Sequence, residues 1–247
     1  QSTQRNYARV LGVPPDSERV QRLTRRTFRH FGRYIVELLH VQGWGLEKVR
    51  HLVTIQGQEH VEEALSHGRG IIFVSGHMGS IEVASTLVLL RGYKVTSVTE
   101  PLQPGFLMDW LLSSRARVGV TLLPVMNSGR RLLRALRRKE MVALVLDVGV
   151  RENGGVLVRF FGQPTYFPGG PARLARLSGA PILFGLALRQ PNNRFTAHVS
   201  PPIFADREAD AEEDVARTTQ RLVEIFEAFV RRFPDQWYPF RDMWPEE

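Results

Sequence analysis

The chain has 247 residues, of which 43% are hydrophobic and 23% charged, with a formal net charge of +8. This hydrophobic fraction is enough to bury a full core, so the composition excludes a largely disordered chain. The sequence contains no cysteine, which excludes disulfide bonds, thiolate metal sites and a covalent intermediate on cysteine. The longest apolar runs, Met141–Leu146 and Pro181–Leu188, are far shorter than the roughly 20 residues that cross a bilayer, so we expect no spanning helix.

Arginine carries nearly all of the positive charge. Of the 33 basic residues, three are lysines (Lys48, Lys94 and Lys139), and the other 30 are arginines. Because the guanidinium group pairs bidentately with phosphate, this balance favours phosphate-rich partners such as an anionic lipid surface, a nucleotide-bearing donor or nucleic acid. An acidic carrier protein would fit as well. Genomic base composition or adaptation to heat would also produce many arginines.

A basic amphipathic helix is expected over residues 17–41. Its apolar residues recur at a helical period, and most of its arginines lie elsewhere around the wheel. The apolar positions are Val20, Leu23, Phe31, Tyr34, Ile35 and Leu38. Such a helix either lies in a membrane interface or packs on a sheet with its basic face in solvent.

Helices and strands then alternate. We expect a helix at 58–67, a strand at 71–75, a helix at 79–91, strands at 94–98 and 121–123 around a helix at 105–117, a helix at 128–139, strands at 142–146 and 156–161, a helix at 171–177, strands at 182–188 and 195–199, and a helix at 210–232. This alternation builds a largely parallel sheet, and the last two strands are close enough to form a hairpin. The fold class is therefore α/β: a single-domain α/β/α sandwich over residues 1–247 with a mostly parallel, mixed central sheet. Residues 1–57 are its N-terminal helical part, which could face a membrane.

The segment Gly76-His77-Met78-Gly79-Ser80-Ile81-Glu82 carries the clearest candidate chemistry. His77 follows a strand at the point where a helix begins, which is where sites form in open α/β sheets. Two helical positions five residues apart differ by about 140°, so His77 and Glu82 can meet only if His77 lies in the turn before the helix. A histidine held by a carboxylate can act as a general base. A helix-capping histidine and a solvent-facing glutamate would have the same spacing.

Other catalytic signatures are missing from the sequence. It has no Gly-x-Ser-x-Gly nucleophile elbow, no phosphate-binding P-loop, no His-Glu-x2-His metal helix and no dinucleotide-binding Gly-x-Gly-x2-Gly. The seven histidines show no metal-ligand spacing, so we expect no metal or redox cofactor.

The segment Ser75–Glu82 resembles the His-x4-Asp/Glu motif of the lysophospholipid acyltransferase superfamily, in the version of the lipid A late acyltransferases and phosphatidylinositol mannoside acyltransferases. The resemblance covers roughly residues 20–244. Further blocks follow in the family's order: Glu100-Pro101, Arg115–Gly119, Leu132–Leu136, Asp147, Phe160–Pro164, Pro168–Ala175, Ser178–Pro181 and Phe233–Trp237.

The resemblance implies that His77 is the general base and Glu82 its carboxylate partner. It implies an acyl thioester donor on coenzyme A or acyl carrier protein, and a second charged pair, Glu100 with Arg115, in which Arg115 either binds a phosphate or is purely structural. Val148 follows Asp147 where a polar residue is often found in the family, so we assign Asp147 no catalytic role.

Two further arginine-containing segments are candidate anion sites. Gly169 and Gly170 lead into a helix start that carries Arg173, and its N–H groups and dipole could bind a phosphate, although an ordinary turn has the same sequence. The helix at 128–139 presents a basic cluster that could meet coenzyme phosphates, anionic headgroups or an acidic carrier, or could simply face solvent. Its members are Arg130, Arg131, Arg134, Arg137, Arg138 and Lys139.

Together these features predict an O-acyltransferase that moves a fatty acyl group onto a hydroxyl of a membrane glycolipid without an acyl-enzyme. The segments Arg33–Glu37 and Glu100-Pro101 favour a phosphatidylinositol mannoside-type acceptor over a lipid A-type one. We expect peripheral attachment to an anionic membrane on the cytoplasmic face of the inner membrane, and no nucleic acid partner. The alternative class is a non-catalytic basic domain that binds lipid or nucleic acid, although no recognisable nucleic-acid module is present.

Overall fold

The computed structural model describes residues 1–40, 46–90, 92–101, 103–117, 119–149 and 155–244. Its central sheet has seven strands in the order β1-β9-β8-β2-β5-β3-β4. The strands of the sheet are β1 (Val53–Gln56), β2 (Ile71–Ser75), β3 (Val95–Thr99), β4 (Val120–Pro124), β5 (Met141–Val145), β8 (Ile182–Arg189) and β9 (Phe195–Val199). The five strands from β8 to β4 are parallel, whereas β9 pairs antiparallel with β8, and β1 is parallel to β9. The predicted α/β class with a mostly parallel, mixed sheet is confirmed.

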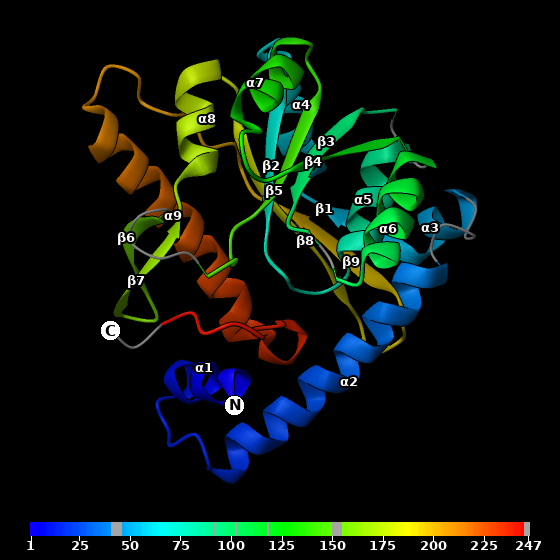
Figure 1. Ribbon diagram of the computed structural model, residues 1–247, viewed down its shortest axis with the longest axis vertical. Helices are drawn as coiled ribbons and strands as arrows, with labels where there is room; N and C mark the ends of the chain where they lie inside the picture. The colour runs from blue at the N-terminus through cyan, green and yellow to red at the C-terminus, as the bar shows by residue number, and fades with distance from the viewer. Residues whose placement is uncertain (41–45, 91, 102, 118, 150–154, 245–247) are drawn as a thin grey trace.

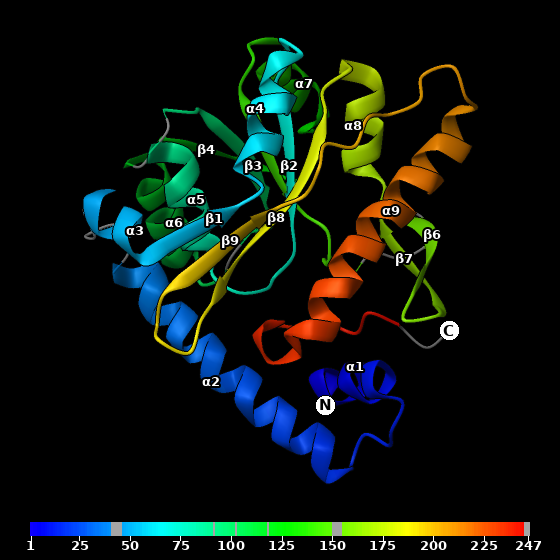
Figure 2. The same ribbon diagram turned by 180° about the vertical axis from the view of Figure 1, so that it is seen from behind.

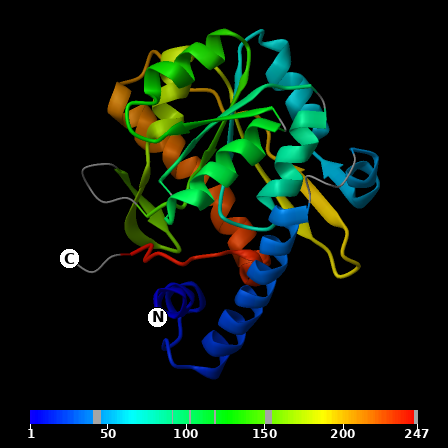
Figure 3. The ribbon, with the colours of Figure 1, turned by 45° about the vertical axis from the view of Figure 1, so that its right-hand side comes forward.

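Helices cover both faces of the sheet (Figure 1, and from behind in Figure 2). The first three helices are α1 (Ser2–Leu11), α2 (Glu18–His40) and α3 (Leu46–Leu52). One face carries α4 (Gln58–Ser66), α5 (Ile81–Leu90) and α6 (Gly105–Arg117). The other carries α7 (Gly129–Arg137), α8 (Gly170–Ser178) and α9 (Ala211–Arg232). Figure 3 shows the long α2 extending away from the sheet toward α1.

The core lies mainly between the sheet and the layer of α7, α8 and α9. Alternation along β2 explains this, because Ile72 and Val74 are fully buried on that side and Phe73 points to the opposite side. Helix α9 begins at an Asp210 cap, whose carboxylate accepts from the backbone N–H groups of Glu212 and Glu213. It presents Phe226 to the sheet, and the chain then returns through a short 3-10 turn, η3 (Pro234–Gln236), to the end of β2.

Four elements were not predicted from the sequence. Helix α1 is mostly polar, and its buried Tyr7 is held by Thr27, Pro234 and Trp237, so tertiary contacts stabilise it. Helix α3 and strand β1 follow α2, and β1 lies within the residues expected to be helical. Strand β7 (Gln163–Pro168) contains two prolines, which are unusual in strands, and it pairs only with β6 (Gly155–Phe160). The structure thus places β6 in a separate hairpin outside the central sheet.

No helix in the described part of the chain is long and apolar enough to cross a membrane.

Candidate active site

His77 lies in the loop between β2 and α5, at the carboxyl end of the parallel strands. Two glycines allow this loop to pack tightly. A Cβ on Gly76 would lie 2.4 Å from the Phe226 ring, and one on Gly79, which has a φ of +67°, would lie 2.2 Å from the Ala187 carbonyl oxygen. The predicted position of His77 in the turn before the helix is therefore the observed one.

The C-terminal segment holds this loop in place. Tyr238 donates its backbone N–H to the His77 carbonyl at 2.8 Å, and Gly79 donates to the carbonyl of Gln236 at 2.8 Å. The Tyr238 hydroxyl donates to the Gly79 carbonyl at 2.9 Å. These bonds fix the backbone on both sides of the histidine, so the ring is presented from a rigid support.

Asp147, the residue that follows β5, is the carboxylate that contacts His77. Its Oδ1 accepts from the His77 backbone N–H at 2.8 Å and lies 3.0 Å from His77 Nδ1. Its Oδ2 accepts from the indole N–H of Trp237 at 3.0 Å. Because an ionised carboxylate only accepts hydrogen bonds, Nδ1 carries the proton, and Nε2 is the ring nitrogen that can take a proton from a substrate.

The electrostatics of this pair stabilise a protonated histidine beside an ionised aspartate. Burial alone lowers the pKa of His77, but the charge and hydrogen bond of Asp147 outweigh it, and the pKa is raised above its ordinary value. Burial raises the pKa of Asp147, but the contacts from His77 and Trp237 more than offset this, and the pKa is lowered. The His77 side chain remains 45% exposed, whereas that of Asp147 is 2% exposed. The base therefore faces outward, and the carboxylate that orients it is buried.

Glu82 has a different partner from the one expected. Both of its carboxylate oxygens pair with the two terminal nitrogens of Arg115, from α6, and the Tyr34 hydroxyl of α2 donates to Oε1 at 3.5 Å. The Glu82 side chain is 1% exposed and that of Arg115 is 13% exposed. The structure thus pairs His77 with Asp147 and Glu82 with Arg115, in place of the expected His77–Glu82 pair. A helical start at Ile81 explains this, because it directs Glu82 toward α6 and α2.

The expected Glu100–Arg115 pair is likewise replaced. Glu100 pairs with Arg241 of the C-terminal segment, and both side chains are about half exposed. The Arg241 contact lowers the pKa of Glu100.

The remaining predicted site residues lie in the layer that covers the opposite face of the sheet. Arg173 pairs with Glu212 at 2.9 Å, and a Cβ on Gly169 would lie 2.6 Å from Val156, so this glycine permits close packing. Gly170 is the first residue of α8. A phosphate-binding role for Gly169, Gly170 and Arg173 stays a prediction.

A cavity of about 210 Å³ opens beside His77, between the sheet and helices α5 and α6. Its walls are largely apolar, with Arg115 and His77 contributing polar groups. The lining includes the last residues of β2, β3 and β5 (Ser75, Thr99 and Val145) and the first residues of β3, β4 and β5 (Val95, Val120 and Met141). The cavity therefore extends along the strands, which at roughly 3.3 Å per residue is a depth of about 13 Å.

These features define a class of site: a histidine base at the mouth of a deep apolar cavity, suited to an enzyme that handles a long apolar group. Among the described residues, no group of three or more histidine, aspartate or glutamate side chains could hold a metal ion.

Comparison with known proteins gives the family. A family model described as bacterial lipid A biosynthesis acyltransferase matches residues 1–245, and the chain belongs to this family. It is 29% identical over 246 residues to a phosphatidylinositol mannoside acyltransferase of Mycobacterium tuberculosis (strain CDC 1551 / Oshkosh), covering 97% of this chain and 75% of that protein. The corresponding values for the Mycolicibacterium smegmatis protein of the same description are 27%, 97% and 78%. A lipid A biosynthesis acyltransferase of Haemophilus influenzae is 25% identical over 183 residues, covering 73% and 55%.

The predicted superfamily, branch and acyltransferase class are confirmed by these matches. The sequence had marked Asp147 as the end of a strand, but the residue after it argued against a role, and Trp237 was noted only as part of a block. What could have identified Asp147 is its position: β2 and β5 are adjacent parallel strands, so residues just beyond their carboxyl ends lie side by side.

Proposed function

We propose that the protein transfers a fatty acyl group from an acyl thioester to a hydroxyl of a phosphatidylinositol mannoside-type glycolipid, with His77 as the general base. The observation that carries this proposal is the oriented His77 ring at the mouth of the apolar cavity. Family membership supports acyl transfer, and the mycobacterial relatives, matched over 97% of the chain, favour this acceptor over a lipid A-type acceptor.

In the proposed mechanism, His77 Nε2 removes the proton of the acceptor hydroxyl as its oxygen attacks the thioester carbonyl. Asp147 stabilises the imidazolium that forms, since it holds Nδ1–H, and the proton then passes to the departing thiolate. The tetrahedral intermediate collapses to the ester and the free thiol without an acyl-enzyme. Glu82 and Arg115 position the start of α5 against α6, next to the loop that bears His77. No cofactor takes part; the donor thiol is coenzyme A or acyl carrier protein.

Peripheral attachment to an anionic membrane is part of the proposal. Helix α2 keeps one apolar stripe exposed: Phe28 (53%), Ile35 (36%), Val36 (56%) and Leu39 (57%). At 100° per residue, exposed arginines including Arg29 and Arg33 lie next to this stripe on the same helix. An exposed apolar stripe flanked by arginines is typical of a helix that lies in a membrane interface, and a cytoplasmic orientation would place it beside the thioester donors.

The direct test is His77→Ala, assayed by thiol release with an acyl-coenzyme A donor and a phosphatidylinositol mannoside acceptor. We expect a loss of at least about 100-fold with an unchanged melting temperature, because general-base contributions run from roughly 100- to 10,000-fold. His67→Ala is the matched control, since His67 packs against Phe204 at the end of α4, and it should keep full activity. Near-normal turnover by His77→Ala would overturn the mechanism.

A further inference from the structure

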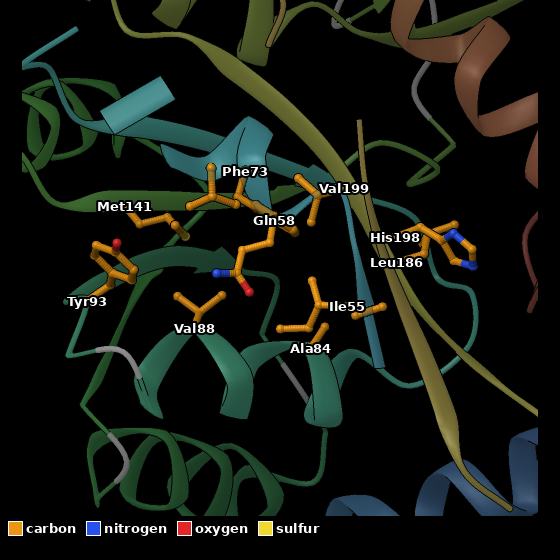
Figure 4. A pocket seen from close by; sticks show the side chains of 12 residues that line it. Ile55, Gln58, Phe73, Ala84, Val88, Tyr93, Met141, Leu186, His198 and Val199 are labelled. Carbon is orange, nitrogen blue, oxygen red and sulfur yellow. The ribbon is translucent and has the colours of Figure 1, made fainter. Parts of the chain in front are cut away.

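A second, smaller cavity adjoins the one beside His77. It has a volume of about 60 Å³ and lies between α4, α5 and the strands β8 and β9, with Ile55, Val61 and Leu186 among its apolar lining (Figure 4). The two cavities share four lining residues: Phe73, Ala84, Val88 and Met141. These four side chains therefore form a wall with one cavity on each side.

Phe73 is the largest residue of this wall, and its position is tightly set. It lies in the middle of β2, and its ring reaches across to β8, where Gly185 leaves room for it. A Cβ on Gly185 would lie 2.3 Å from Phe73 Cζ and 3.0 Å from Cε1, so the ring occupies the space that any other residue would need. Figure 4 shows Phe73 above the cavity, with Val88 and Met141 on neighbouring sides.

The wall closes the cavity far from the catalytic base. His77 lies at the carboxyl ends of the strands, whereas Met141 is the first residue of β5 and Val88 lies in the last turn of α5. An acyl chain whose carbonyl lies at His77 enters the cavity from that end and runs toward the wall. Its terminal methyl group then meets Phe73 before it can reach the second cavity.

We propose that Phe73 determines the longest acyl chain that the enzyme accepts, because its ring separates the cavity beside His77 from the second cavity. This inference rests on the proposed acyl transfer. Removing the ring joins the two spaces, since Gly185 offers no side chain to replace it, and a chain too long for the first cavity then extends into the second.

The test compares the wild-type protein with Phe73→Ala and Phe73→Leu over a series of saturated acyl-coenzyme A donors of increasing length, with a phosphatidylinositol mannoside acceptor. We expect the kcat/KM ratio of the longest donor to the donor preferred by wild type to rise at least about 10-fold in Phe73→Ala, because each methylene that a pocket accommodates changes specificity by roughly 10- to 200-fold. Phe73→Leu should shift less, and it carries the test if Phe73→Ala does not fold.

The matched control is Ile72→Ala. Ile72 is the neighbouring residue of β2, is fully buried and packs in the opposite layer, so its truncation leaves a cavity away from the wall. We expect this variant to keep the wild-type preference. An unchanged preference in both Phe73 variants, or an equal shift in Ile72→Ala, would overturn the inference.

A second measurement separates this inference from the proposed function. Binding of free saturated fatty acids of the same lengths, followed by displacement of a fluorescent fatty acid, does not require turnover. If wild type turns over no thioester, the acyl-transfer proposal fails. If it does turn over thioesters but the Phe73 variants bind long fatty acids no better than wild type does, only the role of Phe73 fails.

Discussion

The two faces of the central sheet are built differently. Under α7, α8 and α9 the core is dense and aromatic: Phe160 stacks with Phe226 at a centroid distance of 5.8 Å, and Trp237 packs edge-on against both. Under α5 and α6 the strands and helices contribute small residues such as Ser97, Ala143 and Ala84, and a cavity of about 210 Å³ remains. Close packing stabilises a fold, whereas a cavity sacrifices contacts, so the dense face supplies the stability that the hollow face lacks.

Asp147 connects the two faces. One of its oxygens accepts from Trp237, whose ring belongs to the dense core, and the other contacts His77, which lines the cavity. The dense core thus fixes the catalytic carboxylate, and the carboxylate fixes the base. The following predictions test this division of labour, from the largest expected effect to the smallest.

The largest effect is expected for Asp147→Asn, which keeps the shape but removes the charge that orients His77. We expect acyl transfer to fall by roughly 100- to 10,000-fold. Asp147 raises the pKa of His77, and only the neutral histidine acts as a base, so wild-type activity falls as the pH drops through that raised pKa. In Asp147→Asn the acidic limb should move to lower pH. The measurement is kcat/KM against pH, and an unmoved limb would contradict the pairing.

Next comes the buried pair of Glu82 and Arg115, on the hollow side. Removing one partner of a buried pair leaves an uncompensated charge, so Arg115→Ala should reduce the free energy of unfolding by about 3–5 kcal/mol. Glu82→Ala should cost a similar amount, and the double variant less than the sum of the two. Denaturant unfolding of the three variants checks this.

Arg115→Lys distinguishes a structural arginine from one that binds substrate. A lysine cannot contact both Glu82 oxygens as the guanidinium does, so a structural role predicts a reduced melting temperature with near-normal turnover per folded molecule. The earlier hypothesis, in which Arg115 binds a phosphate, predicts the reverse: a retained melting temperature and a clear loss of catalytic efficiency.

A smaller effect is expected for two adjacent residues of β5 that face opposite layers. Val142 is fully buried in the dense core, and Val142→Ala should lower the free energy of unfolding by about 1–3 kcal/mol without changing the preferred donor. Ala143 lines the cavity, and Ala143→Leu should cut turnover of the longest donors at least about 10-fold with little loss of stability. Equal stability losses, with donor preference unchanged in both, would remove the distinction between the faces.

The smallest effect concerns the membrane surface. Replacing Arg25, Arg29 and Arg33 of α2 by glutamine should weaken binding to anionic vesicles by about 1 kcal/mol per charge, and high salt should weaken wild-type binding in the same way. The control replaces Arg130, Arg131 and Arg134 of α7, which removes the same charge from another exposed surface. Vesicle sedimentation compares the two variants. Equal losses in both would mean that net charge, rather than α2, drives attachment.

Sequence alone determined the features that depend on local pattern. The alternation of strands and helices is set by hydrophobic period and by turn residues, so it identified the α/β class and the strand at Ile71–Ser75. The position of His77 followed from the glycines on either side of it. The order of several motif blocks identified the family, which the match over residues 1–245 confirms.

Tertiary structure alone decided which charged side chains meet. Neighbours in sequence suggested Glu82 for His77, but a carboxylate 70 positions away contacts it, because adjacent parallel strands bring their carboxyl ends together whatever the length of chain between them. Helix α1 and the C-terminal segment, separated by more than 220 residues, form likewise through contacts with each other. The cavity beside His77 also depends on the fold, since its size follows from small side chains on several strands and helices that only the assembled sheet places around one space.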